Sequence, residues 1–171
     1  MLALFQRRPF IVLAILIGGS SFACAATSAQ ADETQIAVIA SNHDSLPAIS
    51  DNMLREIYLK KIVINSDGRP YIPVNLPPVH RLRDAFIFAV LHMNTLQLQA
   101  YWDRRYFQGV SPPYVLASQT AVVKFVARTS GAIGYVQRCN VTPEVHVILL
   151  VPLPDSAAAG MLEKCPGIAT Q

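Results

Sequence analysis

The chain has 171 residues, a formal net charge of +3 and 52% hydrophobic residues. Its length suits one compact domain with a sizeable core. The small, unclustered charge excess excludes the basic surface that a nucleic-acid-binding protein needs.

Residues 1–31 are predicted to be a secretory signal peptide. Arg7 and Arg8 precede a short apolar run, and small residues follow up to Ala31, in the order that such signals show. Cleavage after Ala31 would leave residues 32–171 as the mature domain, without a membrane span, because the apolar run is too short to cross a bilayer. An uncleaved anchor is the alternative. The arginine pair also resembles a twin-arginine signal, but we expect the general secretory route to the periplasm.

Two cysteines, Cys139 and Cys165, remain in the mature chain, since Cys24 leaves with the signal peptide. In an oxidising compartment such a pair favours a disulfide, so we expect Cys139 and Cys165 to be bridged. The bridge would close a loop of about 26 residues and stabilise the fold by roughly 3 kcal/mol in the chain-entropy model. Two unpaired thiols are the alternative.

The first half of the mature chain predicts a strand, a helix and a pair of strands. Residues 34–40 are apolar and rich in β-branched side chains, which favours a buried strand. Ser50 or Asp51 can cap the helix that follows. Residues 62–64 and 71–74 flank an Asp-Gly turn and predict paired strands.

The second half predicts three helices and two strands. The helices are expected over about residues 80–92, over about residues 94–107 and from Ser118 onward, with a short strand at residues 132–136 after the third. Residues 145–151 form the most hydrophobic strand, which is typical of a sheet centre covered on both sides. Strands that alternate with helices imply an α/β fold with a mainly parallel sheet flanked by helices.

Six short motifs, in order along the chain, resemble those of the phosphate-binding-protein-like family of periplasmic substrate-binding proteins. They are residues 54–61 (LREIYLKK), Asp67-Gly68 with residues 72–74 (IPV), residues 83–86 (RDAF), Tyr101-Trp102, residues 107–109 (FQG) with Pro112-Pro113, and residues 131–136 (GAIGYV). The last matches the family motif without change. The resemblance covers about residues 36–137 and implies one lobe of the type II periplasmic-binding-protein fold.

The resemblance also implies a function. Large relatives hold phosphate between two α/β lobes and pass it to an ABC transporter, and this chain corresponds to their second lobe. We therefore expect an exported solute-binding domain, without a cofactor, whose partners are phosphate or a related oxyanion and an ABC transporter permease. The alternative is a periplasmic module that binds no solute and acts through contacts with another protein.

One stretch departs from the family pattern. Large phosphate binders place a Ser-Gly-Thr cluster and an arginine at the start of the helix that corresponds to residues 80–92, because hydroxyls and an arginine beside a helix N-terminus bind phosphate readily. Residues 77–84 of this chain read PPVHRLRD and contain no Ser, Gly or Thr. The hydroxyl-rich cradle of the large relatives is therefore absent.

A basic pocket is the remaining candidate for anion binding. The carboxyl ends of strands in an open α/β sheet usually face the ligand, so we expect the helix start to face the loop after the first strand. The candidate residues are Ser41, Asn42, His80, Arg81 and Arg83. Alternatively, the arginines are solvated and one of them pairs with the neighbouring aspartate.

Other chemistry has little support in the sequence. The four histidines lie at positions 43, 80, 92 and 146, without the short spacing of a metal site. No serine has the GxSxG context of a nucleophile, so we expect no enzyme activity and no catalytic residue. The aromatic stripe of Tyr101, Trp102, Tyr106 and Phe107 is typical of a core, and exposed rings that meet a partner are the alternative.

Two glycines in the stretch GAIGYV have predicted structural roles. Gly131 lies just past a helix end, where a left-handed conformation favours glycine. Gly134 lies inside a strand, where the missing side chain indicates the close approach of another group. We expect both glycines to shape a helix-to-strand corner and not to hold a ligand.

Overall fold

The computed structural model describes residues 35–44, 46 and 48–153, and the predicted signal peptide and Cys165 lie outside these ranges. The elements follow one another as β1 (Gln35–Ser41), α2 (Asp51–Tyr58), β2 (Ile72–Asn75), α3 (Arg81–Phe86), the π-helix η1 (Ile87–Leu91), α4 (Thr95–Tyr106), β3 (Tyr114–Val115), α5 (Gln119–Arg128), β4 (Ala132–Gln137), the 3-10 helix η2 (Arg138–Asn140) and β5 (Val145–Pro152). The predicted division into residues 1–31 and 32–171 stays a prediction.

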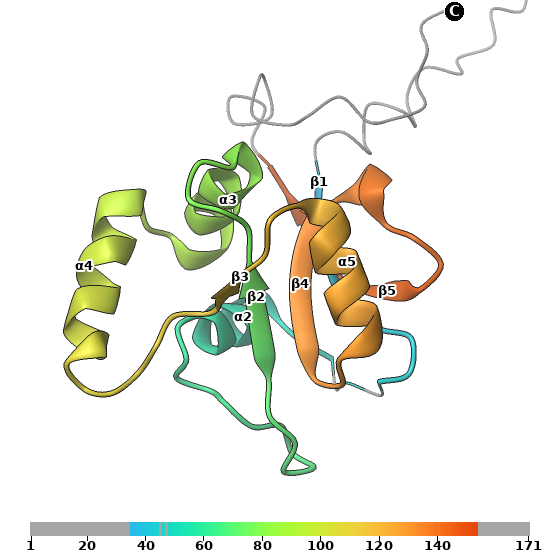
Figure 1. Ribbon diagram of the computed structural model, residues 1–171, viewed down its shortest axis with the longest axis horizontal. Helices are drawn as coiled ribbons and strands as arrows, with labels where there is room; N and C mark the ends of the chain where they lie inside the picture. The colour runs from blue at the N-terminus through green and yellow to red at the C-terminus, as the bar shows by residue number, and fades with distance from the viewer. Residues whose placement is uncertain (1–34, 45, 47, 154–171) are drawn as a thin grey trace, which may run out of the picture.

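The described strands form one sheet in the order β3-β2-β4-β1-β5 (Figure 1). β2 pairs in parallel with β3 and with β4, whereas β1 pairs antiparallel with β4 and with β5. All strands except β1 therefore point in the same direction. The predicted α/β fold with a helix-flanked sheet is confirmed, and the reversed β1 makes the sheet mixed.

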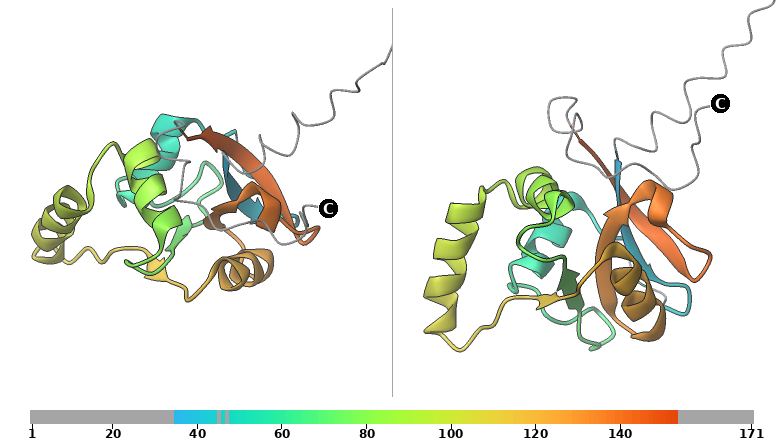
Figure 2. Two further views of the ribbon diagram at one scale, coloured as in Figure 1. Left: turned by 90° about the horizontal axis from the view of Figure 1, so that it is seen from above. Right: turned by 45° about the horizontal axis from the view of Figure 1, so that its top comes forward.

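Helices cover the sheet on both faces, and neighbouring residues of β4 show which helix lies where. A Cβ atom at Gly134 would lie 2.4 Å from Val122 Cγ1 and 3.0 Å from Val126 Cγ2, so α5 packs directly on this face. The next side chain, Tyr135, points to the other face. There its ring lies 3.9 Å from that of Phe86 on α3 and 6.0 Å from that of Tyr58 on α2. Figure 2 shows the sheet between these layers, with α4 to one side.

The position of β5 differs from the prediction. Residues 145–151 were expected at the sheet centre, but β5 is the outermost strand on one side of the sheet, and β1 lies between β4 and β5. Val147 and Leu150 on β5 are partly exposed, whereas residues 36–40 of β1 are fully buried. High hydrophobicity identified a strand, but it did not identify the strand with two neighbours.

Local signals located most helix starts correctly. The side chains of Ser50 and Ser118 cap α2 and α5, as predicted. Asn94 and Gln97 form the predicted capping box at the start of α4. The helix expected over residues 80–92 is interrupted, because α3 widens into η1 and ends at His92 in a left-handed conformation with φ 54°.

The strand pair predicted around the Asp-Gly turn is reduced to a single antiparallel bridge between Ile64 and Pro70. Two backbone hydrogen bonds extend it, from Tyr71 N to Val63 O and from Asn65 N to Arg69 O. Only the second predicted strand joins the sheet, as β2.

The aromatic stripe on α4 is divided between core and surface. Trp102 is buried, and the half-buried Tyr101 donates its hydroxyl to Leu59 O at 2.7 Å. Tyr106 is 70% exposed and Phe107 is 89% exposed. The stripe is therefore core at Trp102 and exposed at Tyr106 and Phe107, and contact of the exposed rings with a partner stays a prediction. None of the helices in the described ranges is long and apolar enough to cross a membrane.

Candidate functional site

The carboxyl ends of β2, β3 and β4 lie at one edge of the sheet, which we call the carboxyl edge. In the chain, α3 follows β2 and α5 follows β3 after short connections. Because β2, β3 and β4 are parallel, both connections leave the sheet at the same edge. The N-termini of both helices therefore belong to this edge. It also holds buried amides, since Asn75 ends β2 and Gln137 ends β4.

A buried hydrogen-bond network fixes the loop between β2 and α3. The hydroxyl of Tyr135 donates to Asn75 Oδ1 at 2.6 Å and accepts from Leu76 N at 3.4 Å. Arg83 Nη1 donates to Leu76 O at 2.8 Å. The arginine thus holds the loop from one side and Tyr135 holds it from the sheet.

Burial controls the protonation of the two tyrosines beneath this loop. Burial raises the pKa of Tyr135 far above its usual value of about 10, and the hydrogen bond from Leu76 and the nearby charge of Arg83 only partly oppose it. Burial also raises the pKa of Tyr58, whose hydroxyl donates to Val74 O at 3.0 Å and lies 3.2 Å from Ile133 O. Both tyrosines therefore stay neutral hydrogen-bond donors even above the pH at which an exposed tyrosine ionises.

A second network joins the start of α5 to the end of β4. Gln119 Oε1 accepts from Gln137 N at 2.7 Å and from Asn140 Nδ2 at 2.9 Å, and Gln119 Nε2 donates to Gln137 Oε1 at 3.0 Å. Gln119 and Gln137 are both buried. This exchange of amide hydrogen bonds holds α5, β4 and η2 together at the carboxyl edge.

Three of the predicted anion-binding residues meet at the start of α3. His80 is the N-cap, and its Nδ1 accepts from Leu82 N at 3.2 Å, which places a ring proton on Nε2. Arg81 is exposed, whereas Arg83 turns toward the loop and uses one of its five donors on Leu76 O.

The other two predicted residues lie at the opposite edge, so the five-residue pocket does not form. Ser41 ends β1, and the register pairs Ala40 with Ile133 near the start of β4. We call this the amino edge, because β2 and β4 begin there. The prediction was wrong because it assumed that β1 ends on the same edge as the other strands, whereas β1 is antiparallel to β4.

Ser41 and Asn42 have structural partners at the amino edge. Ser41 is buried, and its Oγ donates to Ala127 O at 3.2 Å and accepts from His43 N at 3.2 Å. Asn42 donates its side-chain amide to Pro143 O. Both side chains tie the loop after β1 to neighbouring segments.

The sequence reasoning missed both the bond of Asn75 to Tyr135 and the amide network of Gln119, Gln137 and Asn140. A usable signal was present, because a polar residue at the end of an apolar strand marks the edge where the chain leaves the sheet. Among the described residues, no group of three His, Cys, Asp or Glu side chains is arranged to hold a metal ion. Cys139 lies in η2 at the carboxyl edge, and its predicted partner Cys165 lies outside the described residues.

Comparison with known proteins supports the fold. No family model matches the chain, and no curated protein sequence matches it. Among solved structures, it is similar to a substrate-binding protein assigned to phosphate ABC transport in Clostridium perfringens, with bound phosphate (TM-score 0.55, 18% identity, 67% of this chain and 45% of that chain). It is also similar to an ABC-type phosphate transport receptor from Vibrio cholerae (TM-score 0.54, 12% identity, 71% of this chain and 56% of that chain). The chain thus spans about half the length of these proteins, and at such identities the likeness shows the fold.

Proposed function

We propose that this chain is an exported solute-binding domain of the phosphate-binding-protein-like family, and that it binds a small oxyanion at the carboxyl edge. The observation that carries the proposal is that two helices start at that edge, and that one of them, the short helix α3, carries Arg81 and Arg83. Phosphate and sulfate are the ligands of the expected class.

The chemistry of this edge suits an anion. Helix N-termini present backbone N–H groups and a partial positive charge. Arg81 adds an exposed guanidinium, and His80 adds a ring N–H at Nε2. Arg83 stabilises the loop from Leu76 to His80, so the helix start is held in position before a ligand arrives.

Similarity to phosphate-transport proteins supports a role in transport. One of the similar structures holds phosphate, and both belong to ABC-type phosphate systems. We propose an ABC transporter permease, or another periplasmic protein, as its partner. An N-terminal signal peptide and a Cys139–Cys165 bridge would fit a periplasmic location.

Calorimetric titration with phosphate and sulfate tests the proposal. We expect saturable binding with a Kd below about 1 mM, and no saturable heat with chloride at matched ionic strength, which controls for screening. If neither oxyanion binds at about 1 mM, the proposal of anion binding fails.

A second function, protein contact without a solute, has its own observations. The start of α3 lacks hydroxyl side chains, and Tyr106, Phe107 and Tyr114 expose large rings. Exposed aromatic side chains are typical of contact surfaces. This alternative predicts that a stable periplasmic or membrane partner co-purifies with the chain and is lost in a Phe107→Glu variant, while phosphate has no effect.

A further inference from the structure

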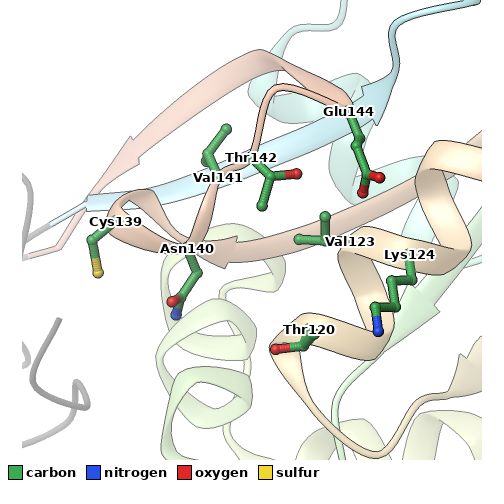
Figure 3. A pocket seen from close by; sticks show the side chains of 8 residues that line it. All are labelled: Thr120, Val123, Lys124, Cys139, Asn140, Val141, Thr142 and Glu144. Atoms are coloured by element: carbon green, nitrogen blue, oxygen red, sulfur yellow. The ribbon is translucent and has the colours of Figure 1, made fainter. Parts of the chain in front are cut away.

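A cavity of about 290 Å³ lies on the face of the sheet that α5 covers. One wall is α5, and the other is the segment of residues 139–144 that connects β4 to β5 (Figure 3). The cavity contains no residue of the α3 start, where His80, Arg81 and Arg83 lie, although Thr120 belongs to the first turn of α5. Its volume is at the small end of the range for ligand sites.

The wall formed by α5 combines an apolar side chain, Val123, with a cationic one, Lys124. Thr120, Val123 and Lys124 are spaced three and four residues apart, so they share one face of α5. Val123 is buried, whereas Thr120 and Lys124 are exposed. A ligand here would meet a methyl surface flanked by a hydroxyl and an ammonium group.

The facing wall carries the opposite charge. Glu144 is exposed and lines the cavity, and none of the ion pairs among the described residues includes Glu144 or Lys124. The two charges thus stand on different walls and form no ion pair with each other. Figure 3 shows both beside Val123.

This wall also holds a polar atom that lacks a partner. Thr142 Oγ1 is buried and has no hydrogen-bond partner among the described residues. Such a group costs free energy unless it is satisfied, and because the oxygen is buried, a ligand would bond to it only if this wall shifts. Asn140, on the same wall, is held by its hydrogen bond to Gln119.

We propose that this cavity binds a small aliphatic amino acid. The carboxylate of the ligand pairs with Lys124, its ammonium group pairs with Glu144, and its side chain packs on Val123. A zwitterion matches both charges at once, whereas a simple anion or cation leaves one charge unmatched. The ligand also offers donors and acceptors to the exposed Thr120.

Three related probes test the proposal by NMR titration of the protein as it is purified from cells. L-valine carries both charges, isovalerate is valine without the amino group, and isobutylamine is valine without the carboxylate. We expect L-valine to bind at least about tenfold more tightly than either fragment, because each charged hydrogen bond contributes about one order of magnitude or more. A preference of less than about threefold, or no saturable shift at about 20 mM L-valine, overturns the proposal.

Two conservative variants test which charged group of the ligand pairs with Lys124 and which pairs with Glu144. Lys124→Gln should weaken L-valine and isovalerate about tenfold and leave isobutylamine unchanged, whereas Glu144→Gln should weaken L-valine and isobutylamine and leave isovalerate unchanged. Arg128→Gln, which removes an exposed charge at the far end of α5, is the matched control. If Lys124→Gln and Glu144→Gln bind L-valine as the control does, the site is not the one proposed. Arg81→Gln should not affect L-valine, so this site and the anion site can fail separately.

Discussion

The two edges of the sheet differ in how their polar groups are used. At the amino edge, the buried Asp44 accepts from Ser130 Oγ at 2.7 Å and from Gly131 N at 2.8 Å, and Ser41 bonds to Ala127. At the carboxyl edge, two helices begin with charged and polar side chains around them. The amino edge is a structural joint. Polar groups also bond to one another at the carboxyl edge, but two helices start there and add donors that a ligand can use.

The largest expected loss of stability comes from adding a side chain at Gly131, at the amino edge. Gly131 has φ +77°, and a Cβ atom there would lie 2.2 Å from Pro70 O, so Gly131→Ala should cost at least about 3 kcal/mol of unfolding free energy. Gly68 has the same φ but nothing within 4 Å of an added Cβ, so Gly68→Ala should cost only about 1 kcal/mol. Urea unfolding measures both. Equal losses would show that backbone strain, not the contact with Pro70, requires glycine at 131.

The next largest effect concerns the predicted bridge at the carboxyl edge. If Cys139 and Cys165 are linked, reduction should lower the free energy of unfolding by roughly 3 kcal/mol, and Cys139→Ser should lower it equally. Unfolding with and without reductant measures the loss, and alkylation followed by mass spectrometry checks the bond. Equal masses with and without reductant would contradict the bridge.

A smaller effect tests the network beneath the α3 loop. Tyr135→Phe removes the donor to Asn75 and the acceptor for Leu76 N, so it should cost about 1–2 kcal/mol at neutral pH. Tyr114→Phe alters an exposed tyrosine and should cost little. An equal loss in the two variants would mean that the network contributes nothing to stability.

The same tyrosine should make stability depend on pH. Burial raises the pKa of Tyr135 in the folded state, whereas a tyrosine in the unfolded chain ionises near pH 10. Its contribution is therefore complete below about pH 10 and is lost as the pH rises further, with a slope of up to about 1.4 kcal/mol per pH unit. Unfolding between about pH 8 and pH 11 should show a shallower decline for Tyr135→Phe than for the unaltered chain. Identical slopes would contradict this assignment.

Local sequence signals account for much of the fold. Ser50, Asn94 and Ser118 cap helices because a short polar side chain before an apolar period satisfies free backbone N–H groups. The sequence also predicted why Gly131 and Gly134 are glycines. Gly131 has a positive φ, and α5 packs too close to Gly134 to leave room for a Cβ atom. These features depend on residues within a few positions of one another or on one packing contact.

Strand order and direction could not be predicted in the same way. β1 and β5 have similar apolar sequences, and only pairing across the chain decides that β1 is central and reversed. That reversal moves Ser41 and Asn42 to the amino edge, so an error in direction became an error in the site. His80, Arg81 and Arg83 stayed together because they follow one another along a single helix start.

The smallest expected effect on stability separates the two edges most sharply. Arg81→Gln removes an exposed charge, so it should change the free energy of unfolding by less than about 0.5 kcal/mol and weaken phosphate binding by about tenfold. Ser41→Ala should do the reverse, because it removes the hydroxyl that bonds to Ala127 O and His43 N and so costs about 1 kcal/mol, while phosphate binding stays unchanged. Calorimetry and urea unfolding on both variants measure the four quantities. Weaker phosphate binding in Ser41→Ala, with full affinity in Arg81→Gln, would place the ligand at the amino edge and remove the distinction between a joint and a binding edge.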